Sequence, residues 1–166
     1  MGVKKLKIKN AKFKIMTTNE DYMKLAIKEA EKAVKEGSAP FGVIVIDKEG
    51  KVIWRDHDRV KERMDPTAHG EVNAIRALCK KLNTLSLKGT TFYTTSEPCP
   101  TCLSACIKAQ VSAVYYGAET EKTASLPIKA EELVKHSKKY PIKVFGGILK
   151  KECLAQRKRL LKSKNN

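Results

Sequence analysis

The feature that most constrains the fold is a regular alternation of strand-like and helix-like segments in the second half of the chain. Residues 90–95, 113–117 and 142–147 are rich in β-branched and aromatic residues, as expected of strands. Segments with helical periodicity, residues 100–110 and 128–139, separate them. An antiparallel neighbour would need only a hairpin, so the intervening helix predicts that the last two strands are parallel. The alternation therefore predicts an α/β fold whose sheet has helices on both faces.

The first part of the chain is expected to contribute one helix and the start of the sheet. Residues 18–36 carry apolar side chains close to a helical period, with Thr18 or Asn19 as the cap. Residues 41–46 and 51–55 are two β-rich runs separated by a short turn that contains glycine. This spacing predicts a hairpin.

A further helix is expected between the hairpin and the third strand. Residues 65–82 read as a helix opened by Pro66 and Thr67. His69 and Glu71 are then predicted to lie in its first turn.

Length and composition indicate one domain without disulfides. The 166 residues suffice to bury a core, so we expect a single domain over 1–166, with an N-terminal extension at 1–17 and a basic C-terminal helix or tail at 154–166. Five cysteines, an odd number, fit a reducing compartment in which thiols are core residues, ligands or nucleophiles. No apolar run is long enough to cross a bilayer, and we expect a cytoplasmic protein with no membrane partner.

The chain is strongly basic, with a formal net charge of +16. Such a field would attract polyanions, and nucleic acid is the obvious candidate. Much of the excess is lysine spread over helix faces and both termini, which also suits a solubilising surface or adaptation to heat. Charge alone therefore leaves the partner open.

The strongest chemical motif is the cysteine pair Cys99 and Cys102, which straddles the start of the helix at 100–110. It could be a redox pair, half of a structural zinc site, or part of a catalytic centre. The chain has only three histidines and one such pair, so four structural ligands are hard to assemble. If His69 is the third ligand, the fourth position is left to water, as in a catalytic zinc site. Cys106, one helical turn after Cys102, is an alternative fourth ligand.

Glu71 is the candidate general acid and base. It follows His69 by two residues, so in the first helical turn its carboxylate can approach a metal-bound water. A hydrolytic zinc enzyme needs such a group to take the proton from the water and pass it to the leaving group.

The segments "HGE" at residues 69–71 and "PCPTC" at residues 98–102 together resemble the zinc-dependent cytidine deaminase-like superfamily. The resemblance implies zinc bound by His69, Cys99 and Cys102, with Glu71 as the proton shuttle. It also implies a three-layer α/β/α sandwich with a mixed five-stranded sheet, and a homodimer. A non-catalytic, nucleic-acid-binding member of the superfamily is the alternative, and the presence of Glu71 argues against it.

Within the superfamily, the helix at 128–139 and the segment "DPTAH" resemble the branch of guanine deaminases and tRNA adenosine deaminases. The segment that contains Phe41 is similar to that of guanine deaminases, whereas the closing basic helix resembles that of the tRNA enzymes. Thr120 stands where the tRNA enzymes usually have aspartate. Asp58 replaces an asparagine that contacts the base in much of this branch, and a carboxylate favours bases whose edge offers N–H donors, such as guanine. An alternative is that Asp58 faces solvent or a basic side chain.

We therefore expect a hydrolytic deaminase of a free purine base or nucleoside, guanine-like in its substrate, with tRNA adenosine as the first alternative and a cytosine compound as the second. The basic tail could contact phosphates or be a solvated helix face. The expected substrate-binding residues are Phe41, Asp58, Ala68, Ser96 and Glu97.

Overall fold

The computed structural model describes residues 18–121, 124 and 126–163, and the expected N-terminal extension lies outside them. One five-stranded sheet runs in the order β2-β1-β3-β4-β5. β1 pairs antiparallel with both β2 and β3, whereas the β3–β4 and β4–β5 pairs are parallel. The mixed sheet and its parallel last pair are thus confirmed. The strand bounds are β1 Gly42–Ile46, β2 Val52–His57, β3 Thr91–Ser96, β4 Ala113–Ala118 and β5 Lys143–Phe145.

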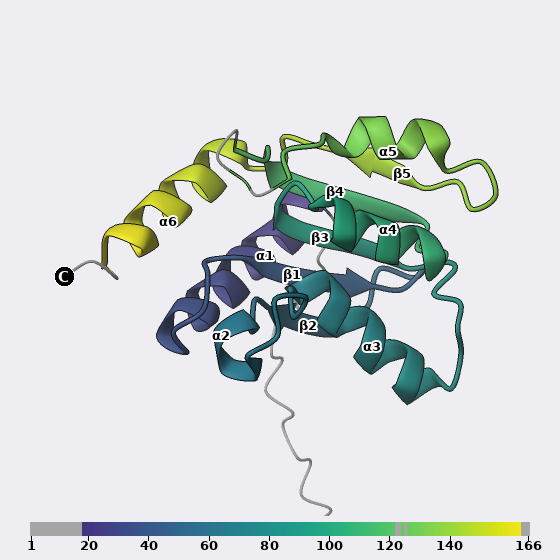
Figure 1. The fold of residues 1–166 in the computed structure, drawn as a ribbon, viewed down its shortest axis with the longest axis horizontal. Helices are drawn as coiled ribbons and strands as arrows, with labels where there is room; N and C mark the ends of the chain where they lie inside the picture. Colours follow the sequence, from purple (N-terminus) through teal and green to yellow (C-terminus); the bar gives the residue numbers. More distant parts are fainter. Residues whose placement is uncertain (1–17, 122–123, 125, 164–166) are drawn as a thin grey trace, which may run out of the picture.

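Helices cover both faces of the sheet and give the molecule three layers (Figure 1). α1 and α6 pack on one face, and α3 and α4 on the other. The helix bounds are α1 Asn19–Lys35, α2 Val60–Arg63, α3 Gly70–Leu82, α4 Pro100–Lys108, α5 Ala130–His136 and α6 Lys150–Ser163. Among the residues described, no helix is long and apolar enough to span a membrane.

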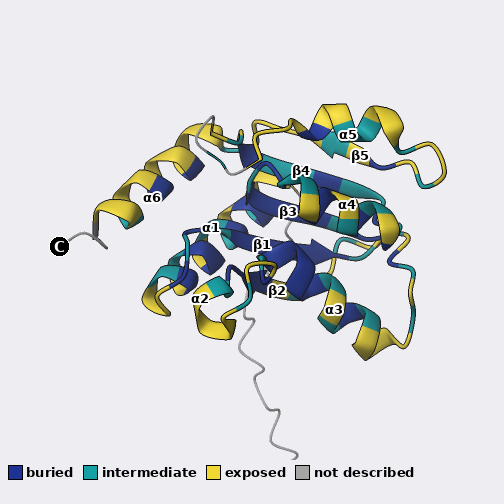
Figure 2. Ribbon diagram, in the orientation of Figure 1, coloured by how far each residue is buried: buried dark blue, intermediate teal, exposed yellow. Residues whose placement is uncertain are grey.

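Alternation along β1 feeds two separate cores. Val43 and Val45 join the cluster under α3 and α4, whereas Ile44 and Ile46 join the cluster under α1. Successive side chains of a strand point to opposite faces, so a strand that is buried on both sides reads as a continuous apolar run. Figure 2 shows the central strands buried and the outer faces of the helices exposed.

The helix expected from residue 65 begins later, at Gly70. The Asp65 carboxylate accepts hydrogen bonds from both the backbone N–H and the hydroxyl of Thr67, at 2.8 and 2.7 Å. Such a local turn competes with helix formation. His69 is consequently the N-cap residue of α3 rather than part of its first turn, whereas Glu71 does lie in that turn.

α6 approaches the sheet closely at Gly117 of β4. A Cβ atom at this position would overlap the Sγ atom of Cys153, which is buried on α6. Glycine thus allows the helix to pack against the strand. This contact places the first turn of α6 near the carboxyl end of β4.

Candidate active site

Two helix starts bring the three candidate metal ligands together. His69 is the N-cap residue of α3, Cys99 is the N-cap residue of α4, and Cys102 lies in the first turn of α4. The Nδ1 atom of His69 lies 3.6 Å from the Sγ atom of Cys99 and 3.4 Å from that of Cys102. Residues that are about thirty positions apart in the chain thus form one compact donor set.

This donor set fits zinc. A tetrahedral ion about 2.3 Å from sulfur and about 2.0 Å from nitrogen would hold those two atoms about 3.6 Å apart. The observed separations agree with this value. Among the described residues, the group contains only these three ligands, and Cys106 is not one of them. The set therefore leaves one coordination position for a small molecule.

The three ligands perturb one another electrostatically. The pKa of the Cys99 thiol is lowered to about 4, mainly by the hydrogen bond between Cys99 and Cys102. Burial acts in the opposite direction. The hydrogen bond with Cys99 raises the pKa of His69 to about 9. The pKa of Cys102 is raised, first by its hydrogen bond with Cys99 and then by burial. These contacts thus favour the thiolate form of Cys99, the form that binds metal.

Glu71 is buried beside the ligands. Its Oε1 atom accepts a hydrogen bond of 2.8 Å from the hydroxyl of Thr94 on β3. Burial raises the pKa of the Glu71 carboxyl group above its ordinary value. A carboxyl group that is easily protonated in a buried cavity suits proton transfer. Thr94 does not stand out in the sequence, where its only signal is its place in the strand that precedes the cysteine pair.

A cavity of about 330 Å³ opens beside these groups. Its wall includes four of the five expected substrate-binding residues: Phe41, Asp58, Ser96 and Glu97. Ala68 does not line it, and its carbonyl oxygen accepts hydrogen bonds from the Arg59 backbone and the Asn73 side chain. Further wall residues come from the segment after β4 and from α6, and of these the sequence had drawn attention to Thr120: Thr120, Glu121, Ala124, Arg157 and Leu161.

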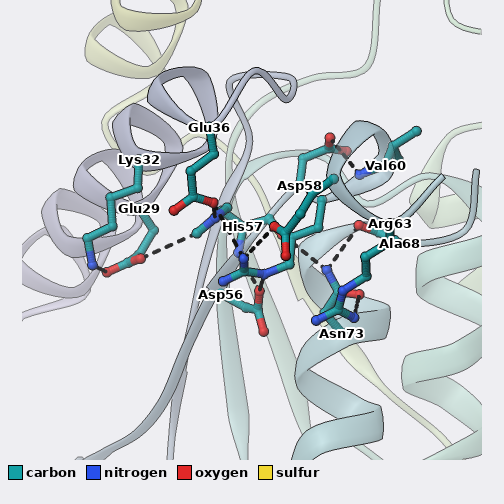
Figure 3. A network of polar contacts seen from close by, with 12 residues as sticks. Glu29, Lys32, Glu36, Asp56, His57, Asp58, Val60, Arg63, Ala68 and Asn73 are labelled. Carbon is teal, nitrogen blue, oxygen red and sulfur yellow. Dashed lines mark hydrogen bonds and ion pairs between the residues drawn. The ribbon is translucent and has the colours of Figure 1, made fainter. Parts of the chain in front are cut away.

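Asp58 is held at the cavity wall by backbone groups. Its Oδ1 atom accepts from the N–H of Ala39 at 3.2 Å and from that of Val60 at 3.4 Å. Figure 3 shows it beside the start of α2. The residue is 4% exposed, so it does not face solvent. One carboxylate oxygen is therefore fixed by these bonds.

Neighbouring His57 belongs to the sheet rather than to a loop. His57 ends β2, is buried, and its Nε2 atom lies 2.7 Å from a carboxylate oxygen of Glu36 (Figure 3). Its backbone carbonyl accepts from the Asn73 side chain of α3. His57 thus joins α1, β2 and α3 behind the cavity.

Glu97 has most of its hydrogen-bonding capacity engaged by the protein. Its carboxylate accepts from the backbone N–H groups of Thr120 and Ala130, at 2.9 and 2.8 Å, and from the Lys129 ammonium group at 3.2 Å. Burial opposes ionisation, but these hydrogen bonds outweigh it and lower the pKa of Glu97. Glu97 thus anchors the segment that follows β4.

Comparison with known proteins decides between the possible chemistries of this site. The model of the cytidine and deoxycytidylate deaminase zinc-binding region matches residues 16–118, well over half of the chain. The chain belongs to this family. Zinc is therefore its cofactor, and this family member is a hydrolytic deaminase of nucleobases or nucleosides.

Similar proteins act on two kinds of substrate. The chain is 36% identical over 138 residues to a tRNA-specific adenosine deaminase of Bacillus subtilis, covering 83% of this chain and 85% of that protein. It is 41% identical over 102 residues to a guanine deaminase of the same organism, covering 61% and 65%. A solved structure from a study of tRNA:A34 deaminases superimposes with a TM-score of 0.73 at 30% identity, covering 81% and 97%. The guanine deaminase of Nitrosomonas europaea shares the fold, with a TM-score of 0.76 at 20% identity over 87% and 85% of the chains.

Proposed function

We propose that this zinc-dependent deaminase hydrolyses a free purine base, with guanine as the preferred substrate. Water adds to the ring carbon that bears the amino group, the C–N bond breaks, and ammonia leaves. His69, Cys99 and Cys102 hold the zinc ion. When bound, zinc acidifies a water molecule and so supplies the nucleophile at neutral pH.

Glu71 carries the protons in this proposal. It accepts one from the attacking water and delivers it to the departing amino group, which leaves as ammonia. The Thr94 hydroxyl holds one carboxylate oxygen and so helps to orient the group at the cavity wall. Because Glu71 is buried, its carboxyl group exchanges protons with the substrate rather than with bulk water.

The observation that carries the choice of substrate is Asp58 in the cavity wall. An ionised carboxylate accepts hydrogen bonds and donates none. It therefore suits a base with N–H groups on its edge, as guanine has, and it is mismatched with the ring nitrogen N1 of adenine. Phe41 supplies an apolar surface against which a flat base can pack.

Adenosine in tRNA is the second candidate substrate. The similarity to tRNA-specific adenosine deaminases supports it, as do the exposed basic residues of α6: Lys158, Arg159 and Lys162. Lys164, which was also expected to contribute to this basic surface, lies outside the described residues. Exposed lysines and arginines at such a surface would contact phosphates and make binding fall with salt.

Assembly, extent and location are proposals as well. The resemblance to the family supports a homodimer. Length and composition support a single deaminase domain over 1–166, with a basic C-terminal helix or tail at 154–166, and a cytoplasmic location. Small-molecule purines, with tRNA as the alternative, are the proposed partners.

A substrate panel tests the proposal. The purified zinc protein is incubated with guanine, adenine, cytosine, their nucleosides and an anticodon stem-loop, and ammonia is measured. We expect release from guanine and none from adenine. Ammonia from the stem-loop alone would refute the first candidate in favour of the second.

The role of Glu71 has its own variant. Glu71→Ala should keep zinc, measured by elemental analysis, and lose about 10²- to 10⁴-fold in kcat because the proton carrier is gone. Glu49→Ala, in the exposed hairpin turn, is the matched control and should keep full turnover. Turnover by Glu71→Ala at the wild-type rate would overturn the mechanism.

A further inference from the structure

Arg157 of α6 reaches into the wall of the substrate cavity, far along the chain from the zinc site. It lines the same cavity as Glu71 and the three metal ligands, and its side chain is only 7% exposed. It also lies outside the segment that the family model matches, residues 16–118. Neither the metal chemistry nor the proton transfer described above uses this residue.

Two contacts hold the guanidinium group in place. Its Cζ atom lies 5.3 Å from the centre of the Phe41 ring, on the ring face. Its Nη1 atom donates a hydrogen bond of 3.1 Å to the Oε1 atom of Glu121. Both partners line the cavity, so the charged end of Arg157 lies at the cavity wall.

One edge of the guanidinium group is left without a partner. The Nη2 atom is buried, and among the described residues it has no hydrogen-bond acceptor. A buried donor without an acceptor is unfavourable, because it has lost its hydrogen bonds to water and gained none. A substrate with an acceptor at this place would remove that cost once the guanidinium turned slightly toward it.

The charges around the cavity indicate what kind of hydrogen-bond acceptor a substrate would offer to Arg157. Four carboxyl groups line it: Asp58, Glu71, Glu97 and Glu121. Among the described lining residues, Arg157 is the only arginine or lysine. A phosphate group would face repulsion from several of these carboxylates, and Glu121 already neutralises the arginine. A neutral carbonyl oxygen avoids this repulsion.

We propose that Arg157 is a substrate-binding residue that donates a hydrogen bond to the ring carbonyl of an oxopurine. This inference rests on the proposed deamination of free purines and names the group that selects among them. Phe41 connects the two polar groups involved: its backbone carbonyl accepts from the N–H of Asp58, and its ring lies under Arg157. Guanine carries N1–H next to its carbonyl oxygen, so Asp58 can accept from the first while Arg157 donates to the second.

The test compares guanine with 2,6-diaminopurine, which has an amino group in place of the carbonyl. Arg157→Leu should lower kcat/KM for guanine about 10- to 100-fold, the usual effect of removing a hydrogen bond from a charged donor. It should leave kcat/KM for 2,6-diaminopurine unchanged or raise it. Arg157→Lys keeps the charge without the planar fork and should fall between the two. Products are identified by chromatography.

Arg55→Leu is the matched control. Arg55 lies on β2 at the edge of the sheet, is exposed, and does not line the cavity. It should leave the ratio of the two kcat/KM values at the wild-type level. Thermal unfolding of each variant shows whether it is folded at the assay temperature. A changed ratio in a folded variant then reports a loss of substrate contact rather than a loss of the fold.

The outcomes distinguish the two levels of the proposal. If the protein deaminates guanine but Arg157→Leu does not change the ratio of the two kcat/KM values, the role of Arg157 is overturned and the proposed function stands. If Arg157→Leu loses only the turnover of guanosine 5′-monophosphate, the proposed contact of Arg157 with a ring carbonyl is overturned in favour of phosphate binding. Wild-type protein that deaminates neither base overturns the proposed function, and the role of Arg157 with it.

Discussion

Thr94 is outside the proposed metal ligands but contacts the proposed proton carrier, Glu71. It lies on β3, is 1% exposed, and its hydroxyl donates to the carboxylate of Glu71. Glu71 is therefore positioned by a neighbouring strand as well as by its own helix. We infer that Thr94 is a positioning residue, since it acts through Glu71.

Replacing this hydroxyl gives a prediction at the scale of one residue. Thr94→Val should lower kcat by about fivefold, because the loss of one hydrogen bond of about 1 kcal/mol leaves Glu71 less well oriented. Zinc content, measured by elemental analysis, should not change. Thr94→Ser keeps a hydroxyl group and should recover most of the rate. A Thr94→Ser variant as slow as Thr94→Val would indicate that packing, rather than the hydrogen bond, matters here.

At the scale of elements, the aromatic rings of Tyr22, Tyr93, Tyr115 and Phe145 connect α1 with β3, β4 and β5. Successive ring centroids lie 4.9 to 5.1 Å apart. Parallel neighbours place equivalent positions side by side, so a ladder of this kind forms across a sheet. It joins the helix and three strands on the face opposite α3 and α4.

Tyr93 makes this ladder sensitive to high pH. Its burial raises the pKa of its hydroxyl group to about 12. Between about pH 10 and pH 12 the unfolded chain has lost this proton while the folded protein keeps it, so the free energy of unfolding should fall as the pH rises. Denaturant unfolding at pH 9 and pH 11 measures this change, and Tyr93→Phe should make the decrease smaller. An equal decrease in both proteins would exclude Tyr93 as its source.

The start of α3 could be predicted only approximately. Helical periodicity is visible from residue 65 onward, but the local hydrogen bonds of Asp65 with Thr67 delay the helix to Gly70. Side chains that bond to their own backbone compete with helix formation, and periodicity does not register this competition. The consequence is favourable, because His69 is left in an extended conformation at the helix start, facing the two cysteines.

At the scale of the whole molecule, zinc would connect α3 with α4. The proposed ligands come from two helix starts on one face of the sheet. A metal that binds only the folded state stabilises it by about 3 to 4 kcal/mol when free zinc exceeds its Kd by 100- to 1,000-fold. Metal content and global stability are thus coupled.

Removing the metal tests this coupling. A chelator should abolish ammonia release and lower the Tm by several degrees, and added zinc should restore both. Cys99→Ser should behave like the chelated protein, whereas Cys79→Ser, which changes a thiol of α3 outside the ligand group, should keep its zinc. Full activity in protein shown to be free of metal would contradict the proposed site.

The sequence by itself determined the features that depend on neighbouring residues. Strand and helix periodicities predicted the mixed sheet, and the paired motifs around His69 and Cys99 indicated zinc and its ligands. Only the tertiary structure decided which distant side chains complete the cavity. Arg157 meets Phe41, and Thr94 meets Glu71, because the fold brings segments from both faces of the sheet to the wall of one cavity. Such contacts depend on how whole elements are placed, and spacing along the chain carries little of that information.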